Sequence, residues 1–377
     1  MTNNNHNKRL LLLGAGHAHM VAIRQWLEQG TVLPKDTILI NPEPEAWYSG
    51  MMPGLIAGRF AREDCLIELE PLCQQLGIQL QLRRVVSLDI QSQCVWFRDG
   101  GNLPFSLLSI NSGSVTHALP SDGSIALLPV KPFADFYRRW QTWRQDNPQA
   151  TDVAIVGGGA AAVEIALAVS ANSQLHGLTV TVYVDRDVLA GFPANVSGRV
   201  QKLLGRRGVK IQPQARVGYI ENGMLYRSDN NRIASADVVI AATGSAALSW
   251  YHNSQLSTDS DGFILVEPTL QAIRQSNIFV SGDACSLANN PRSGVYAVRH
   301  GDVLARNIPA QLQGNPLQNF YPQTKALALL STGNGGAVAR YGTSGASHPL
   351  LRPILGLWKD QLDKSYIRDH SVNGAYR

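Results

Sequence analysis

The sequence is short of the features that mark several common protein classes. It has only four cysteines among 377 residues, and these show neither C-x-x-C spacing nor a cluster with histidine, which argues against a zinc site or a redox dithiol. Near the start, four consecutive leucines end at Gly14, and this apolar run is too short for a signal peptide or a membrane-spanning helix. We therefore expect reduced core thiols, no bound metal and a cytoplasmic protein.

Blocks of like charge are also absent. The chain carries 33 basic and 28 acidic residues, and its net charge of +5 is spread along the sequence. A nucleic-acid-binding tail is therefore not indicated, whereas anionic cofactors or an anionic membrane surface would suit the charge. With 377 residues, 44% of them hydrophobic, the chain is too long for one ordinary core and predicts two or three packed domains.

Two segments repeat one pattern of apolar strand, glycine turn, apolar helix and second strand. The first runs from "LLLLGAGHAHMVAI" at 10–23 to "TILIN" at 37–41, and the second from "VAIVGGGAAAVEIALAV" at 153–169 to "TVTVYVD" at 179–185. The spacing agrees, because Asn41 lies 27 residues after Gly14 and Asp185 lies 28 residues after Gly157. The repeat predicts an α/β fold with two Rossmann-like dinucleotide-binding units.

The glycines have distinct physical roles in such a turn. The first two let the chain turn tightly and approach a pyrophosphate, which then meets the free N–H groups at the helix N-terminus; here they are Gly14, Gly16, Gly157 and Gly159. The third position only lets helix and strand pack closely, and Ala162 is a mild change there. His19 is a large one, so we expect the first helix to lie further out or to be rotated.

The residue that closes the second strand of each unit can bind a ribose. Asp185 would accept bonds from both adenosine ribose hydroxyls and repel a 2'-phosphate, which favours NADH over NADPH. Asn41 holds the same place in the first unit. Its amide can bond a ribose hydroxyl, or the residue can simply begin the "NPEP" turn.

Three further segments resemble the flavoprotein family that pairs an FAD domain with an inserted NAD(P)H domain, as in glutathione reductase. They are "LLSINSGS" at 107–114, "SADVVIAATGS" at 235–245 and "SNIFVSGDAC" at 276–285. The resemblance implies a discontinuous FAD-binding domain over 1–120 and 246–312. It also implies an NAD(P)H-binding domain over 121–245 and a C-terminal interface or membrane-docking region over 313–377.

Within that family the chain resembles type II NADH dehydrogenases, and most closely the NADH-dehydrogenase-like proteins also found fused ahead of selenide, water dikinase. The likeness rests on "GAGHAH", "YSGMMPGLIAG" at 48–58, "VKP" at 130–132, "SGVYAVRHG" and "LWKDQLDKSYI". Together the motifs imply that FAD and NAD(P)H are held by Gly14, Gly16, His17, Ala18, Asn41, Ser49, Gly50, Pro53, Ser112, Gly113, Gly282, Asp283, Gly157, Gly159, Ala162, Asp185, Thr243 and Gly244.

The implied reaction moves hydride from nicotinamide to flavin, and the flavin supplies the difficult chemistry. Glu164, on the helix that would face both rings, is the candidate for orienting nicotinamide or relaying a proton; a capping or ion-pair role is the alternative. Lys131 could stabilise negative charge on the reduced flavin, or be a linker lysine. His17 would be neutral at the positive end of its helix.

The electron acceptor is not indicated by any motif. Cysteine pairs suited to disulfide or sulfide chemistry are missing, and Val295 and Arg299 stand where type II NADH dehydrogenases have glutamines near the quinone. Quinone reduction is allowed. The alternative function is a regulatory flavin module associated with selenium metabolism, with little turnover.

The C-terminal segment 349–369 predicts an amphipathic helix. Leu355, Trp358, Leu362 and Tyr366 share one face. That face would dock on the inner surface of a membrane, or pack on the FAD domain or a second subunit of a homodimer.

Overall fold

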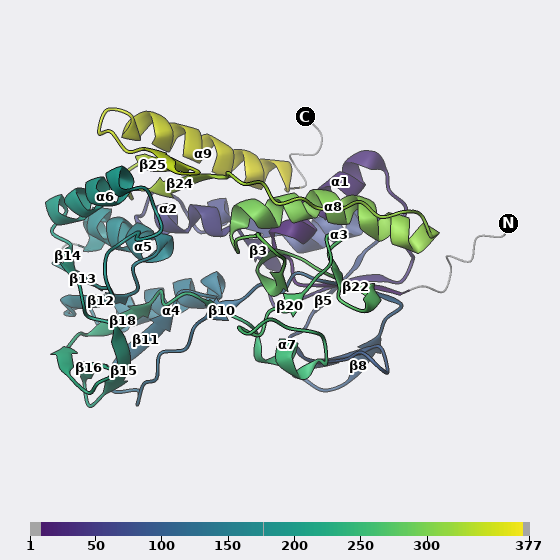
Figure 1. Cartoon of the computed structure of the whole chain (residues 1–377), viewed down its shortest axis with the longest axis horizontal. Helices are drawn as coiled ribbons and strands as arrows, with labels where there is room; N and C mark the ends of the chain where they lie inside the picture. Colours follow the sequence, from purple (N-terminus) through teal and green to yellow (C-terminus); the bar gives the residue numbers. More distant parts are fainter. Residues whose placement is uncertain (1–8, 176, 372–377) are drawn as a thin grey trace.

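The computed structural model describes residues 9–175 and 177–371, and its core contains two largely parallel β-sheets (Figure 1). The first has the strand order β21-β22-β9-β1-β2-β5, with only the edge strand β21 antiparallel. Its strands are β1 (Leu10–Leu13), β2 (Thr37–Asn41), β5 (Gln79–Leu82), β9 (Leu107–Ile110), β21 (Gln271–Ala272) and β22 (Gln275–Val280). All four leucines of β1 are fully buried, as a central strand covered on both faces requires.

The second sheet has the order β11-β18-β12-β13-β14, and all its strands run parallel. The strands are β11 (Ala126–Pro129), β12 (Asp152–Val156), β13 (Thr179–Tyr183), β14 (Lys210–Gln212) and β18 (Val238–Ala241). In both sheets the strand before the glycine turn lies between the second strand of its unit and a strand from later in the chain. The predicted fold class, α/β with two Rossmann-like units, is confirmed.

Helices pack on both sheets. In the first unit α1 (His17–Gln29) lies against α8 (Gly294–Gln313), where the Trp26 indole N–H donates to the Ala305 carbonyl at 2.9 Å. Gly301 permits this close approach, because a Cβ there would lie 2.5 Å from Val21 Cβ. The other helices are α2 (Met52–Ile56), α3 (Leu69–Leu76), α4 (Phe133–Asp146), α5 (Ala160–Ala171), α6 (Ala194–Arg206) and α7 (Ser249–Asn253).

Smaller sheets of two or three short strands are attached to the two units. One group comprises β3 (Glu45–Trp47), β4 (Leu66–Glu68), β6 (Val85–Asp89), β7 (Cys94–Phe97), β8 (Asn102–Pro104), β15 (Val217–Glu221), β16 (Met224–Arg227) and β17 (Arg232–Ala234). Strands β20 (Ile264–Leu265) and β23 (Cys285–Ser286) form a short parallel pair. The chain passes between the units through β10 (Val115–Thr116) and β19 (Ser245–Ala246), which pair antiparallel.

The C-terminal region forms a three-stranded sheet and a long helix. The strands are β24 (Leu327–Ser331), β25 (Ala337–Tyr341) and β26 (Ser344–Ala346), and α9 (Arg352–Asp369) lies along β24 and β25 before reaching the side of α1 and α8 (Figure 1). Over the residues described, no helix is both long and apolar enough to cross a membrane.

Helix α9 buries charged residues and exposes apolar ones, which is the reverse of the usual amphipathic helix. Its fully packed residues are Gly356, Lys359 and Asp363, whereas Leu357 is 70% exposed and Trp358 is 46% exposed. Of the face predicted from the sequence, Trp358 and Leu362 are each 46% exposed, whereas the Tyr366 ring stacks on that of Tyr48. Docking of this face on a membrane or a second subunit stays a prediction. The spacing of apolar residues predicted the apolar stripe, but the buried face of the helix carries the charged residues Lys359 and Asp363.

Candidate functional site

The first glycine turn is held in shape by Asn111, at the end of β9. A Cβ on Gly14 would lie 2.7 Å from the Asn111 carbonyl oxygen, and one on Gly16 would lie 2.3 Å from its side-chain oxygen. Gly14 also has a positive φ of 86°. Only glycine fits at these two positions, so the α1 N-terminus is presented in the shape that an anion site needs.

Asn111 also reaches the Gly282 turn. Its side-chain N–H₂ donates to the Ser281 carbonyl at 3.0 Å, while its side-chain oxygen accepts from the His19 backbone N–H at 3.2 Å. A Cβ on Gly282 would lie 2.6 Å from the same amide nitrogen. One buried side chain therefore sets the positions of two motifs, which lie 92 and 170 residues from it in sequence. The motif reading named Ser112 and Gly113 and missed Asn111.

His19 occupies the third-glycine position and is fully buried. Its Nδ1 lies 2.6 Å from the Gly14 carbonyl, which can only accept, so Nδ1 donates and Nε2 accepts from the Ser109 hydroxyl at 2.8 Å. Burial lowers the pKa of His19 to about 4. The neutral ring thus braces the turn against β9. That it displaces the helix stays a prediction.

His17 begins α1 beside two tyrosines. Its ring centroid lies 5.4 Å from that of Tyr48 and 5.6 Å from that of Tyr366, and these two tyrosines stack at 4.3 Å. Burial lowers the pKa of His17, the Asp283 charge opposes this shift and the Lys131 charge adds to it. The neutral form expected at a helix N-terminus agrees with this direction.

Asn41 ends β2 with its side chain turned back onto the chain. The oxygen accepts from the Ala15 N–H at 3.0 Å, and the N–H₂ donates to the Glu43 carbonyl at 2.7 Å. This residue therefore ties the glycine turn to the "NPEP" segment, and Ala18 lies fully buried behind that turn.

Lys131 and Asp283 form an ion pair between the two units. The ammonium lies 2.6 Å from Asp283 Oδ2 and donates to the hydroxyls of Ser114 and Ser245 at 3.0 and 2.8 Å. Burial would raise the pKa of Asp283, but the charge and hydrogen bond of Lys131 outweigh it and lower the pKa overall. The structure thus brings Lys131 to the Gly282–Asp283 motif.

The second glycine turn resembles the first at its leading glycine and differs at the next. A Cβ on Gly157 would lie 2.2 Å from the Ala242 carbonyl oxygen, whereas one on Gly159 meets nothing within 4 Å. Ala162 is fully buried at the packing position, and Asp185 is exposed beyond β13. Nearby, the Thr243 hydroxyl donates to the His117 carbonyl at 2.6 Å, and Gly244 has a φ of 103°. The open side of Gly159 leaves room for a ligand at the α5 N-terminus.

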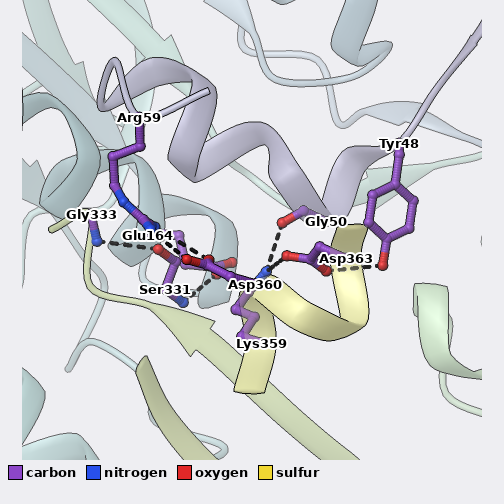
Figure 2. Close-up of polar contacts among 9 residues, drawn as sticks. All are labelled: Tyr48, Gly50, Arg59, Glu164, Ser331, Gly333, Lys359, Asp360 and Asp363. Atoms are coloured by element: carbon purple, nitrogen blue, oxygen red, sulfur yellow. Dashed lines mark hydrogen bonds and ion pairs between the residues drawn. The ribbon is translucent and has the colours of Figure 1, made fainter. Parts of the chain in front are cut away.

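Glu164 lies in a polar cluster that the C-terminal helix completes (Figure 2). Its Oε1 accepts from the Ser331 backbone N–H at 2.8 Å. Burial raises the pKa of Glu164 to about 7, although the Lys359 charge and the Ser331 bond act in the opposite direction. A carboxyl with this pKa exchanges a proton near neutral pH.

Lys359 links this cluster to the segment 48–58. Its ammonium donates to the Gly50 carbonyl at 2.7 Å and to Asp363 Oδ2 at 2.6 Å, while the Tyr48 hydroxyl donates to Asp363 Oδ1 at 3.1 Å (Figure 2). Gly50 lies under the Tyr48 ring, where a Cβ would be 2.7 Å from ring carbons. Ser49 is exposed, and Pro53 is buried in α2. Sequence reasoning missed Lys359.

The cysteines are poorly suited to exchange chemistry. All four are free, and burial raises the pKa of Cys65, Cys73 and Cys285 to about 12. Since the thiolate is the reactive form, these thiols are inert near neutral pH.

Comparison with known protein families identifies the family in which these paired glycine turns occur. A family model of pyridine nucleotide-disulphide oxidoreductases matches residues 8–301. The chain belongs to this family. Membership confirms the expected class, and the oxidoreductase is FAD-dependent, uses NAD(P)H and is of the type II NADH dehydrogenase-like kind.

Three relatives match this chain over most of their own length. The oxidoreductase is 26% identical over 348 residues to ferroptosis suppressor protein 1 of Xenopus tropicalis, covering 88% of each chain. It is 24% identical to the NADH dehydrogenase-like protein YutJ of Bacillus subtilis, covering 94% of this chain and 97% of the relative. With the demethylphylloquinone reductase NdbB of Synechocystis it shares 22% identity, over 88% and 86% of the two chains.

A solved structure supports the fold. The sulfide:quinone oxidoreductase of Aquifex aeolicus superimposes with a TM-score of 0.77 at 16% identity, covering 97% of this chain and 92% of that one.

Proposed function

We propose that the oxidoreductase binds FAD at the first glycine turn and NADH at the second, and passes the electrons on to a quinone-class acceptor. The observation that carries the proposal is a pair of like-built glycine turns, each following the central strand of a parallel sheet. The FAD unit would comprise residues 1–120 and 246–312, and the NADH unit residues 121–245. Residues 313–377 would form the C-terminal region.

The residues present fit a dinucleotide at the first turn. Gly14, Gly16 and the α1 N-terminus would hold its pyrophosphate, and Asp283 would bind the ribityl and phosphate region while Lys131 neutralises the carboxylate. When bound, the flavin accepts hydride from nicotinamide. Ser112, Gly113 and segment 48–53 would line the rest of the site.

The residues at the second turn fit a nicotinamide dinucleotide without a 2'-phosphate. Gly159 leaves space at the α5 N-terminus, and among the described residues no side chain pairs with the exposed Asp185 carboxylate. That carboxylate would accept both ribose hydroxyls. NADH is therefore the proposed donor.

Glu164 and Lys359 would act together on the second half-reaction. A carboxyl with a pKa of about 7 can give a proton to an acceptor that gains negative charge, and the buried Lys359 ammonium favours the carboxylate that remains. Quinones take up two electrons and two protons, so they match this arrangement. The Synechocystis relative is named a demethylphylloquinone reductase, which supports the same class of acceptor.

The exposed stripe on α9 supports contact with a membrane surface, where quinones dissolve. On α9, Ile354, Leu357, Trp358 and Leu362 are 64%, 70%, 46% and 46% exposed, and Leu350, which precedes the helix, is 79% exposed. An interfacial helix presents such a stripe with a tryptophan to the headgroup boundary. The inner face of the membrane is the proposed location.

The test begins with the colour of the protein. Purified oxidoreductase should be yellow, and anaerobic NADH should bleach the flavin band. Reoxidation should then be fastest with a short-chain quinone and slower with oxygen or with selenium and sulfur compounds. A colourless protein, or a bound flavin that NADH leaves oxidised, would contradict the proposal.

A further inference from the structure

A cavity of about 340 Å³ lies away from both glycine turns. It is formed where the C-terminal end of α6, the glycine-rich turn Thr332–Gly336 and the start of α9 meet. Arg207 and Arg352 both line it, together with Asn334 and Gly336. No residue assigned to cofactor or hydride chemistry lines it.

The two guanidinium groups have no anionic partner. Among the described residues, neither Arg207 nor Arg352 has an ion pair or a side-chain hydrogen bond. The carboxylates of α9 that lie nearest in sequence are engaged elsewhere, Asp360 with Arg59 and Asp363 with Lys359. Burial lowers the pKa of Arg207, and the charge of Arg352 lowers it further. Two like charges therefore share one cavity without compensation.

The start of α9 adds to the positive potential. This helix has no side-chain cap and no acidic residue in its first turn, and its first residue is Arg352. A cation at a helix N-terminus is unfavourable, because the helix dipole is positive there. The arrangement becomes favourable once an anion lies between the arginines.

We propose that this cavity binds a phosphoryl anion between Arg207 and Arg352. Guanidinium groups match phosphate oxygens with paired hydrogen bonds, and two of them lining one cavity suit a group with several charged oxygens. Exposed Leu351 and Ile354 lie beside the site on the same turn of chain. The phosphoryl group can therefore come from free phosphate or from a phospholipid head group. An anion held there would join α6 to α9.

The experiment measures thermal unfolding of the full-length protein with its flavin bound. Inorganic phosphate is compared with chloride at equal ionic strength, in wild type and in Arg207→Gln, Arg352→Gln and Arg206→Gln. Arg206 is the matched control, because it is an exposed arginine next to Arg207 that does not line the cavity. Phosphate should raise the midpoint by roughly 2–4 °C in wild type and in R206Q. R207Q and R352Q should lose this gain.

The stability of the variants in chloride and the pattern of the phosphate effect can each refute the proposal. In chloride, R207Q and R352Q should unfold at the wild-type temperature or above it, because each removes a repulsion. An equal phosphate effect in all four proteins, no effect in any of them, or a large loss of stability in chloride would overturn the proposal.

A second arm distinguishes the sources of the phosphoryl group. Wild type is mixed with vesicles of phosphatidylcholine containing phosphatidylglycerol, and binding is measured with increasing inorganic phosphate against chloride of equal ionic strength. Specific competition by phosphate, absent in R207Q, assigns the cavity to a lipid head group. Vesicle binding that ignores phosphate, together with the thermal result above, assigns it to the free anion.

Discussion

At the scale of single residues, Asn111 is the side chain on which the proposed FAD site depends. It is 4% exposed and bonds two backbone groups from different motifs. Asn111→Ala leaves a buried N–H and a buried carbonyl unpaired, which costs about 1–3 kcal/mol each. We expect lower thermal stability and flavin released at protein concentrations where wild type retains it. Absorbance at the flavin band after gel filtration measures the second effect, and the exposed Asn319→Ala should leave it unchanged.

Glu164 should give the reaction its pH dependence. Because burial raises the pKa of this carboxyl to about 7, it holds its proton below that pH and loses it above. Acceptor reduction should therefore fall as pH rises through about 7. Glu164→Gln should lower kcat for the acceptor step by roughly 100-fold and flatten this limb. The exposed Glu70→Gln should keep the wild-type profile, and an unchanged profile in E164Q would refute the assignment.

The same shift predicts a change in stability. Burial raises the folded-state pKa of Glu164 to about 7, above the ordinary carboxyl value of 4.5 that holds in the unfolded chain. Its contribution is therefore fully present below about pH 4.5 and is lost as pH rises to about 7. Relative to wild type, E164Q should gain stability across this interval and keep that gain at higher pH. Thermal unfolding at pH 5 and pH 8 measures the difference.

Asp185 should set the choice between NADH and NADPH. Its exposed carboxylate would repel a 2'-phosphate, so Asp185→Ser should raise kcat/KM for NADPH relative to NADH by roughly tenfold, which corresponds to about 1.4 kcal/mol. Asp187→Ser, at an exposed carboxylate two residues away, should leave the ratio near its wild-type value. Steady-state rates with both nucleotides decide between these outcomes.

At the scale of elements, α9 separates two tasks between its two faces. The buried face carries Lys359 and Asp363 to the segment 48–50, and the outer face carries apolar side chains that are 46–70% exposed. Replacing Leu357 and Trp358 together by serine should therefore leave thermal stability near wild type and weaken binding to anionic vesicles by at least tenfold. Val32→Ser, at an 89% exposed apolar residue elsewhere, is the control. Sedimentation with vesicles measures the binding, and equal pelleting of all three proteins would refute membrane contact.

At the scale of the whole molecule, the sequence predicts both sheets because their signals are local. An apolar strand, a glycine turn and a helix lie within 20 residues of each other, so the repeat at 10–41 and 153–185 could be recognised without tertiary contacts. Asn111, Ser331 and Lys359 could not be found this way. Their contacts join segments between about 90 and 310 residues apart. The face that α9 buries was unpredictable for the same reason, since the partners of Lys359 and Asp363 lie more than 300 residues earlier, at Gly50 and Tyr48.

The antiparallel pairing of β10 with β19 has a consequence for how the chain is divided. Val115 faces Ala246, and Thr116 faces Ser245, so the place where the polypeptide leaves the first sheet adjoins the place where it returns. Paired Cα atoms in such a ladder lie only about 5 Å apart. A linker of a few residues could therefore close that gap. The polypeptide thus enters and leaves residues 117–244 at one place, so this pair of strands holds both crossings of the chain together.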